Sequence, residues 1–98
     1  MLECRPAWDG NWTWDGFLAF SWQGPDDERL LVTVNYASNQ GQCYVRVLFG
    51  DLLGQTVRLR DRLSSAVYDR PGDDLVVPGL YLDLPGWGYH VFEVTRVA

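Results

Sequence analysis

The side chains that could carry chemistry in this sequence are few and far apart. His90 is the only histidine. It shares the alternating phase of Phe92 and Val94, which favours a packed histidine with a satisfied ring nitrogen over a catalytic base. Carboxylates are numerous enough for a glycosidase-type pair, but a small β fold predicts shallow surfaces and no deep cleft to raise a pKa. None of the serines has the Gly-x-Ser-x-Gly setting of a nucleophile: Ser21, Ser38, Ser64 and Ser65. We therefore predict no catalytic residue and no enzymatic activity of this chain alone.

The candidate metal ligands are equally sparse. Cys4 and Cys43, with one histidine, are too few for a zinc site or a disulfide scaffold. Cys43 sits in an apolar strand and Cys4 in a predicted loop, and the sequence leaves open whether they meet. The acidic doublets Asp26-Asp27 and Asp73-Asp74 lack the spaced oxygen ligands of a calcium loop, which favours solvated turns. We predict no metal and no cofactor.

The aromatic residues are the feature that could bind a ligand. Five Trp and five Tyr are many for 98 residues, and a flat ring with a polar edge stacks well on a sugar. Trp14 and Trp22 follow the phase of the predicted core. The candidates outside that phase form two pairs, Trp8 with Trp12 and Trp87 with Tyr89. If these rings are exposed together, they mark either a sugar-binding platform or an interface that another domain covers.

Composition limits the partners. A formal net charge of -5, with arginines scattered among acidic residues, argues against nucleic acid and anionic membranes. No apolar run approaches the roughly 20 residues that cross a bilayer. The start of the chain lacks the basic and apolar regions of a secretory signal, which favours the cytoplasm over export. We expect the isolated chain to be a monomer.

Alternating apolar residues predict that these side chains are carried by β-strands. Residues 1–13 (Met1–Thr13), rich in turn residues, are predicted to be irregular, and residues 14–98 to form a single β-sandwich domain. Short connections favour antiparallel pairing. The predicted fold class is all-β: an antiparallel sandwich of about seven or eight short strands of Greek-key type. The predicted strands are Trp14–Trp22, Leu30–Tyr36, Cys43–Phe49, a strand from Val57 that runs toward Asp61 and Leu63, Ala66–Arg70, Leu75–Val77, Leu80–Leu84 and Tyr89–Val94.

Two of these expectations concern how strands face and pair. In Trp14–Trp22 the bulky residues occupy even positions, so the even face is predicted to be the core face. In Leu30–Tyr36 the even residues share one face, and Thr33 and Asn35 lie opposite. Pro85 to Gly88 form a turn, which predicts that Leu80–Leu84 and Tyr89–Val94 close the chain as a hairpin.

Three segments together resemble a known family. FLAFSW, a polar turn and LLVTVNYA, closing on Asn35 and Tyr36, are followed by Asp61-Arg62-Leu63 with Tyr68. The ending LYLDLPGWGYHVFEV completes the set with Leu84, Pro85, Gly88, Val91 and Phe92. In this order, from Phe17 to Val94, they resemble the C-terminal all-β domain of the α-amylase family of glycoside hydrolases. Gly86 stands where many members have a second proline, and Trp22 where an arginine is common.

The resemblance implies a parent enzyme, bacterial and active on α-glucans such as starch or glycogen, either a glycosidase or a glucanotransferase. Its catalytic residues would lie on an upstream (β/α)8 barrel, which needs about 250 residues, so none is expected here. The domain's implied role is non-catalytic: it packs on the barrel and stabilises it. The alternative is an α-glucan-binding module. Trp8, Trp12, Trp87 and Tyr89 are the candidate residues for either role.

Overall fold

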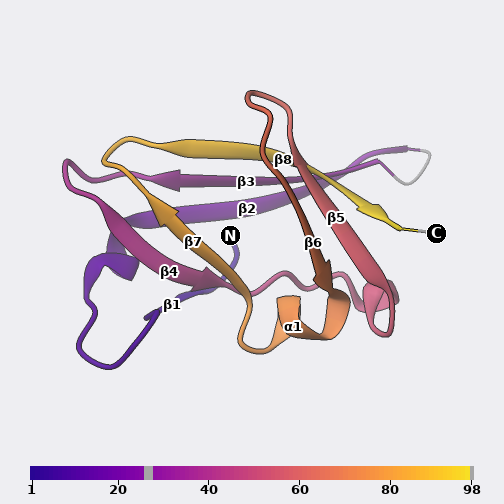
Figure 1. The fold of residues 1–98 in the computed structure, drawn as a ribbon, viewed down its shortest axis with the longest axis horizontal. Coiled ribbons are helices and arrows are strands. Elements are labelled where there is room, and N and C mark those ends of the chain that lie inside the picture. Colours follow the sequence, from indigo (N-terminus) through magenta and orange to yellow (C-terminus); the bar gives the residue numbers. More distant parts are fainter. Residues whose placement is uncertain (26–27, 98) are drawn as a thin grey trace.

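The chain folds into two facing antiparallel sheets (Figure 1). The computed structural model describes residues 1–25 and 28–97, so the Asp26-Asp27 doublet lies outside the described residues. The strands are β1 (Cys4–Arg5), β2 (Phe17–Gln23), β3 (Arg29–Asn35), β4 (Gly41–Val45), β5 (Thr56–Asp61), β6 (Val67–Pro71), β7 (Leu80–Leu84) and β8 (Tyr89–Arg96). Short helical segments are η1 (Thr13–Gly16), η3 (Gly50–Leu52) and α1 (Gly72–Val76).

The large sheet has the order β2-β3-β8-β5-β6 and the small sheet the order β1-β4-β7. The chain crosses between sheets after β1, β3, β4, β6 and β7, and β8 is inserted between β3 and β5. Such crossings are typical of Greek-key sandwiches. The predicted all-β antiparallel sandwich is therefore confirmed.

The core fills the space between the sheets. One residue in two along each strand points inward, as the pleat of a strand requires. Phe92 of β8 and Leu31 of β3 are fully buried from the large sheet, and Cys43 and Val45 of β4 from the small one. These inward rows hold the two sheets together, so either outer face is free to serve another purpose.

The predicted C-terminal hairpin is wrong. β7 pairs with β4 in the small sheet, whereas β8 pairs with β3 and β5 in the large sheet. The turn between them crosses the sandwich and is held by Asn35, whose Nδ2 donates to the carbonyl oxygens of Leu84 at 3.1 Å and Pro85 at 3.2 Å. A turn at Pro85 is compatible with a hairpin and with a crossing between sheets. Only long-range contacts such as this one distinguish the two arrangements.

The predicted core face of the first strand is also wrong. β2 buries Phe17 and Ala19 and turns its even residues outward, Trp22 included. Trp14 lies in η1, half-buried, rather than in a strand. Because β3 pairs residue for residue with β2, its inward row is Leu31, Thr33 and Asn35. The larger apolar row of this pair of strands therefore faces out.

Three further boundaries differ from expectation. Leu75–Val77 is not a strand, because α1 spans Gly72–Val76 and buries Leu75 from a helix instead. The chain bends at Gly72, where an added Cβ would lie 1.9 Å from the Leu52 carbonyl oxygen. Met1–Thr13 is not wholly irregular, since β1 lies within it. The strand predicted to run to Phe49 ends at Val45, as β4.

Candidate functional site

The outer surface of β2, β3 and the first half of β8 is an apolar face. Cross-strand pairs place its residues side by side: Leu18 opposite Val34, Phe20 opposite Val32 and Trp22 opposite Leu30. β8 continues the rows, with Tyr89 opposite Val34 and Val91 opposite Val32. The apolar face therefore consists of Leu18, Phe20, Trp22, Leu30, Val32, Val34, Tyr89 and Val91.

The large side chains of the apolar face are strongly exposed. The exposed fraction is 39% for Leu18, 47% for Phe20, 48% for Trp22 and 57% for Tyr89. Scattered apolar residues are normal on a protein surface, but a contiguous patch on three paired strands indicates an interaction surface.

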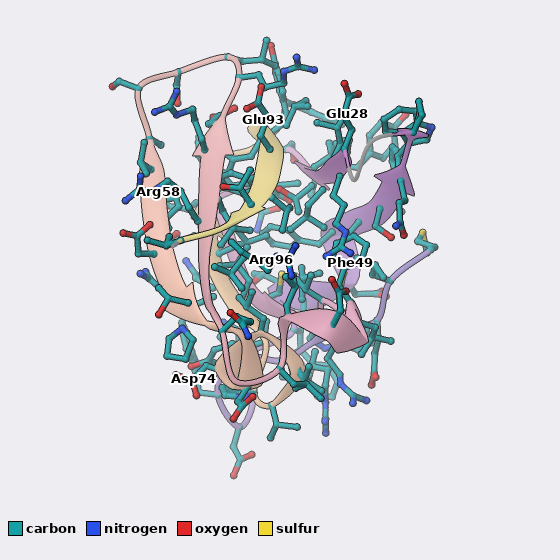
Figure 2. The ribbon with its side chains drawn as sticks, turned by 90° about the vertical axis from the view of Figure 1, so that its right-hand side faces the viewer. Glu28, Phe49, Arg58, Asp74, Glu93 and Arg96 are labelled. Carbon is teal, nitrogen blue, oxygen red and sulfur yellow. The ribbon has the colours of Figure 1, made fainter. Side chains whose placement is uncertain are left out.

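The other half of the same outer surface is charged. Arg58 Nε of β5 lies 2.9 Å from Asp69 Oδ1 of β6, and Arg62 Nε, just after β5, lies 2.9 Å from Glu93 Oε1 of β8. The Arg58 guanidinium lowers the pKa of Asp69. Figure 2 labels Arg58 and Glu93 on this half. Exposed ion pairs of this kind are typical of a solvated face and stabilise little. One sheet surface is thus divided into an apolar half and a charged half.

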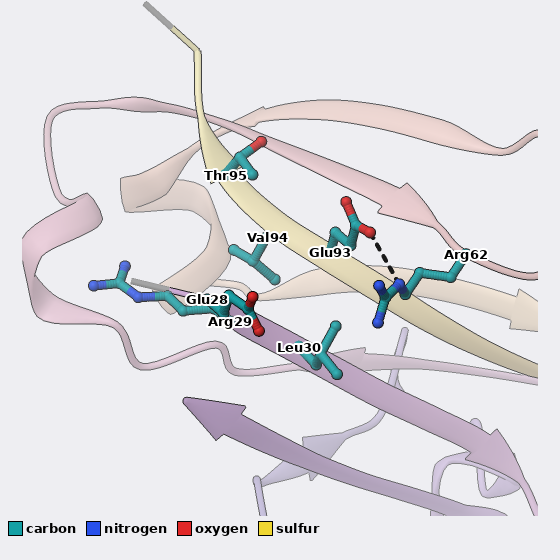
Figure 3. A pocket seen from close by; sticks show the side chains of 7 residues that line it. All are labelled: Glu28, Arg29, Leu30, Arg62, Glu93, Val94 and Thr95. Carbon is teal, nitrogen blue, oxygen red and sulfur yellow. Dashed lines mark ion pairs between the residues drawn. The ribbon is translucent and has the colours of Figure 1, made fainter. Parts of the chain in front are cut away.

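A hollow of about 290 Å³ opens where β3 and β8 separate (Figure 3). The ladder between these strands ends at Leu30 and Glu93, while β8 stays paired with β5 as far as Arg96. Glu28, Arg29, Arg62 and Glu93 line the hollow, and the Arg62 and Glu93 side chains pair with each other. Opposite charges balance here, which gives the hollow no clear preference for an anion or a cation.

Trp87 lies beside Tyr36 at the crossing turn. The rings of Tyr36 and Trp87 meet edge to face, with centroids 5.2 Å apart. Trp87 has a positive φ of 62°, and its amide lies 3.0 Å from the carbonyl oxygens of both Asn35 and Ala37. These bonds hold an exposed indole at the crossing turn, two residues before Tyr89 on the apolar face.

Trp8 and Trp12 lie in two different hollows. Trp8 borders a hollow of about 420 Å³ with Arg5, Asp9 and Tyr44. Trp12, which is 78% exposed, borders one of about 390 Å³ with Asp15, Asn35 and Asn39. No hollow that we find contains both rings. The structure therefore leaves Trp8 and Trp12 in separate hollows, and it places Trp87 against Tyr36.

Asp61 and His90 belong to a polar cluster at the edge of the core. Asp61, buried at the end of β5, accepts hydrogen bonds at Oδ1 from the amides of Leu63 at 3.1 Å and Val91 at 3.3 Å. Its Oδ2 accepts one from Ser64 Oγ at 2.8 Å and lies 2.7 Å from His90 Nδ1. The His90 ring stacks on Phe92, with centroids 4.6 Å apart. The predicted packed histidine with a satisfied ring nitrogen is confirmed.

This cluster stabilises the fold rather than activating a nucleophile. Burial is the largest single influence on Asp61 and acts to raise its pKa, but the four hydrogen bonds outweigh it and lower the pKa to about 2. Ser64 donates to the carboxylate and not to the imidazole, so the histidine does not activate its hydroxyl. The sequence showed no link between these residues, since Asp61 and His90 meet only through the pairing of β5 with β8.

In the described part of the chain no group of three or more His, Cys, Asp or Glu side chains could hold a metal ion. No helix formed by residues 1–25 or 28–97 is long and apolar enough to cross a bilayer.

Comparison with known proteins assigns this chain to no family. No family profile, curated protein or solved structure matches this chain. The resemblance to the α-amylase family therefore stays a prediction from the sequence.

The sequence reasoning missed most of the apolar face. Leu18, Phe20 and Trp22 were assigned to the core because they are the bulkiest alternating residues of their strand. A signal was present in β3, where the outward row consists of Leu30, Val32 and Val34 and the inward row contains Thr33 and Asn35. With Leu31 on the inward row, β3 carries apolar residues on both of its faces, a pattern that indicates burial on both.

Proposed function

We propose that this chain is a non-catalytic β-sandwich domain that packs through its apolar face on the catalytic (β/α)8 barrel of an α-amylase-type enzyme. The observation that carries the proposal is the contrast across one sheet surface. The half on β2, β3 and β8 presents apolar side chains, while the half on β5 and β6 presents ion pairs. A sheet with no partner would be expected to carry polar residues on the whole of its outer surface.

Covering the apolar face would yield substantial free energy. Fully burying a large apolar side chain contributes roughly 1.5 to 3 kcal/mol. Leu18, Phe20, Trp22 and Tyr89 are each about half exposed, so covering them contributes roughly 1 kcal/mol apiece. Within one polypeptide the entropic cost of association is lower, because the two domains are linked and meet at a high effective concentration.

The resemblance supplies the identity of the partner. The segments FLAFSW and LLVTVNYA, which resemble the opening of the family's C-terminal domain, are β2 and β3. Their outward residues supply six of the eight members of the apolar face. The proposed partner is the upstream barrel, and the proposed activity belongs to that barrel: hydrolysis or transfer on α-glucans.

The polypeptide that carries this chain offers a direct test. Phe20→Asp should lower the melting temperature of the full polypeptide by about 5 °C or more, because a carboxylate would be buried at the domain contact. In the 98-residue chain alone the same change should lower the melting temperature by less than in the full polypeptide, because Phe20 is already about half exposed there. Differential scanning calorimetry of both proteins measures the two effects.

Val67→Asp is the matched control. Val67 is an exposed apolar residue opposite Arg60, on the charged half of the same sheet surface. It should leave both proteins unchanged. Equal, small effects of Phe20→Asp and Val67→Asp on the full polypeptide would refute packing through the apolar face.

A second candidate function, binding of an α-glucan, is favoured by the hollow beside Trp8. An exposed indole and the ring of Tyr44 lie there with the charged groups of Arg5 and Asp9. Aromatic faces stack on sugar rings, and charged groups hydrogen-bond to hydroxyls. Tyr44 belongs to the small sheet, so this hollow is separate from the apolar face of the large sheet.

Titration of maltoheptaose into the ¹⁵N-labelled chain tests sugar binding. The Trp8 indole resonance should shift with a dissociation constant on the order of 1 mM, typical of a single shallow stacking site. Trp8→Ala should abolish the shifts that the sugar causes in the other resonances of the chain. Trp12→Ala, in the other hollow, should not abolish them. If the Trp8 indole resonance does not shift at a maltoheptaose concentration about 10-fold above that dissociation constant, this candidate is ruled out.

A further inference from the structure

The two cysteines lie on adjacent strands of the small sheet. In the pairing of β1 with β4, Cys4 lies opposite Val45. Cys43 is two residues from Val45 along β4, so the pleat turns both cysteine side chains toward the same, inner face. Cys43 is completely buried and Cys4 is partly accessible. Both thiols are free.

The two thiols affect each other's ionisation. The neighbouring Cys43 thiol lowers the pKa of Cys4 against the opposing effects of the burial of Cys4 and of Glu3. The neighbouring Cys4 thiol, together with burial, raises the pKa of Cys43. The accessible sulfur is thus the better nucleophile, and the buried one is held beside it.

We infer that Cys4 and Cys43 form an intramolecular disulfide when the protein meets a small disulfide oxidant such as glutathione disulfide. The Cys4 thiolate attacks the oxidant, forms a mixed disulfide and releases one glutathione thiolate. The Cys43 sulfur, after losing its proton, attacks the Cys4 sulfur and releases the second glutathione. The protein loses two protons and two electrons, and the oxidant becomes two thiols.

The position of β1 makes this bond feasible. Diagonal neighbours in an antiparallel pair have Cα atoms about 7 to 8 Å apart, slightly beyond the usual range of a disulfide. Closing the bond therefore requires β1 to move by about 1 Å. β1 has two residues, at the edge of the small sheet, and can shift without disturbing the inner strands. The bond would close a loop of about 40 residues. It would stabilise the fold by lowering the conformational entropy of the unfolded chain.

The 98-residue chain, equilibrated in glutathione buffers from fully reduced to fully oxidised, tests the inference. Oxidation should lower the intact mass by about 2 Da, block alkylation of both cysteines and raise the melting temperature by roughly 10 °C. Trypsin, which cleaves after Arg29 and Arg46, should then release Met1–Arg29 joined to Leu30–Arg46.

Two controls separate this bond from other oxidation products. Cys4→Ser should be insensitive to the buffer, with no gain in melting temperature, and dithiothreitol should reverse the change in the wild type. The inference is overturned if both thiols can still be alkylated in the most oxidising buffer. A stable glutathione adduct on Cys4, or a disulfide-linked dimer, would overturn it equally.

Discussion

Asn35→Asp should lower the free energy of unfolding at pH 7 by about 3 to 5 kcal/mol, a large share of the stability of a small domain. Asn35 is buried, and its Nδ2 donates to the carbonyl oxygens of Asn39 at 2.9 Å, Leu84 at 3.1 Å and Pro85 at 3.2 Å. An ionised carboxylate has no proton to donate. It would face three carbonyl oxygens without solvent, where the asparagine amide now holds β3 to the turn that crosses between the sheets.

The loss should depend on pH in a defined direction. Burial and the surrounding carbonyl oxygens would raise the pKa of the new carboxyl above its ordinary value of about 3.9. Below about pH 4 the group is neutral in both the folded and unfolded states, so most of the deficit should disappear. As pH rises from about 4 through the raised folded pKa, the unfolded state releases the proton more readily and the variant loses stability.

Urea denaturation of the wild type and variant between pH 4 and 7 measures this effect. Asn39→Asp is the control, because the Asn39 side chain is exposed and contributes only its backbone carbonyl to the contact. It should stay within about 0.5 kcal/mol of the wild type. A deficit of Asn35→Asp that does not change with pH would show that lost packing, and not the buried charge, is responsible.

Asp61→Ala should lower the free energy of unfolding at pH 7 by about 3 kcal/mol, because it leaves four hydrogen-bond partners without their acceptor. Two of them are the backbone amides of Leu63 and Val91, which join the end of β5 to β8. The other two are Ser64 and the ring of His90. The His90 ring should then lose its fixed orientation against Phe92.

The ionisation of Asp61 should contribute a pH dependence of the opposite sign to Asn35→Asp. Its pKa is about 2 in the folded protein, against about 3.9 in the unfolded chain. The carboxylate therefore contributes roughly 2 to 3 kcal/mol at neutral pH, and this contribution is lost as the pH falls from about 5 through the folded pKa of about 2. Asp61→Asn, which keeps the shape of the side chain, should lack this acid-dependent component.

Denaturant titrations of the wild type, Asp61→Asn and Asp69→Asn between pH 2 and 5 test the assignment. Asp69 is also ion-paired, with Arg58, but it is exposed and screened by solvent, so its substitution should leave the acid sensitivity of the wild type in place. If Asp61→Asn keeps the acid sensitivity of the wild type, another carboxylate must account for it.

The sequence was sufficient for the predictions that depend on local pattern. Alternating apolar residues and closely spaced turn residues predicted an all-β antiparallel sandwich, and the phase of His90 with Phe92 and Val94 predicted a packed histidine. Both are confirmed, because the pleat of a strand determines which side chains share a face whatever the strand packs against. Leu75–Val77 was predicted as a strand, but Leu75 and Val76 belong to α1. A short apolar run is compatible with either a strand or a buried helix.

The contacts between segments needed the tertiary structure. Alternation groups Leu18, Phe20 and Trp22 together, but which face turns inward depends on where the second sheet lies. The partner of His90 is 29 residues away along the chain, and the approach of Cys4 to Cys43 follows from the pairing of β1 with β4. The amino-acid sequence by itself determined the strands and the residues that share a face. Only the packing of the two sheets decided which face is covered and which residues meet, because these are properties of long-range pairing rather than of local period.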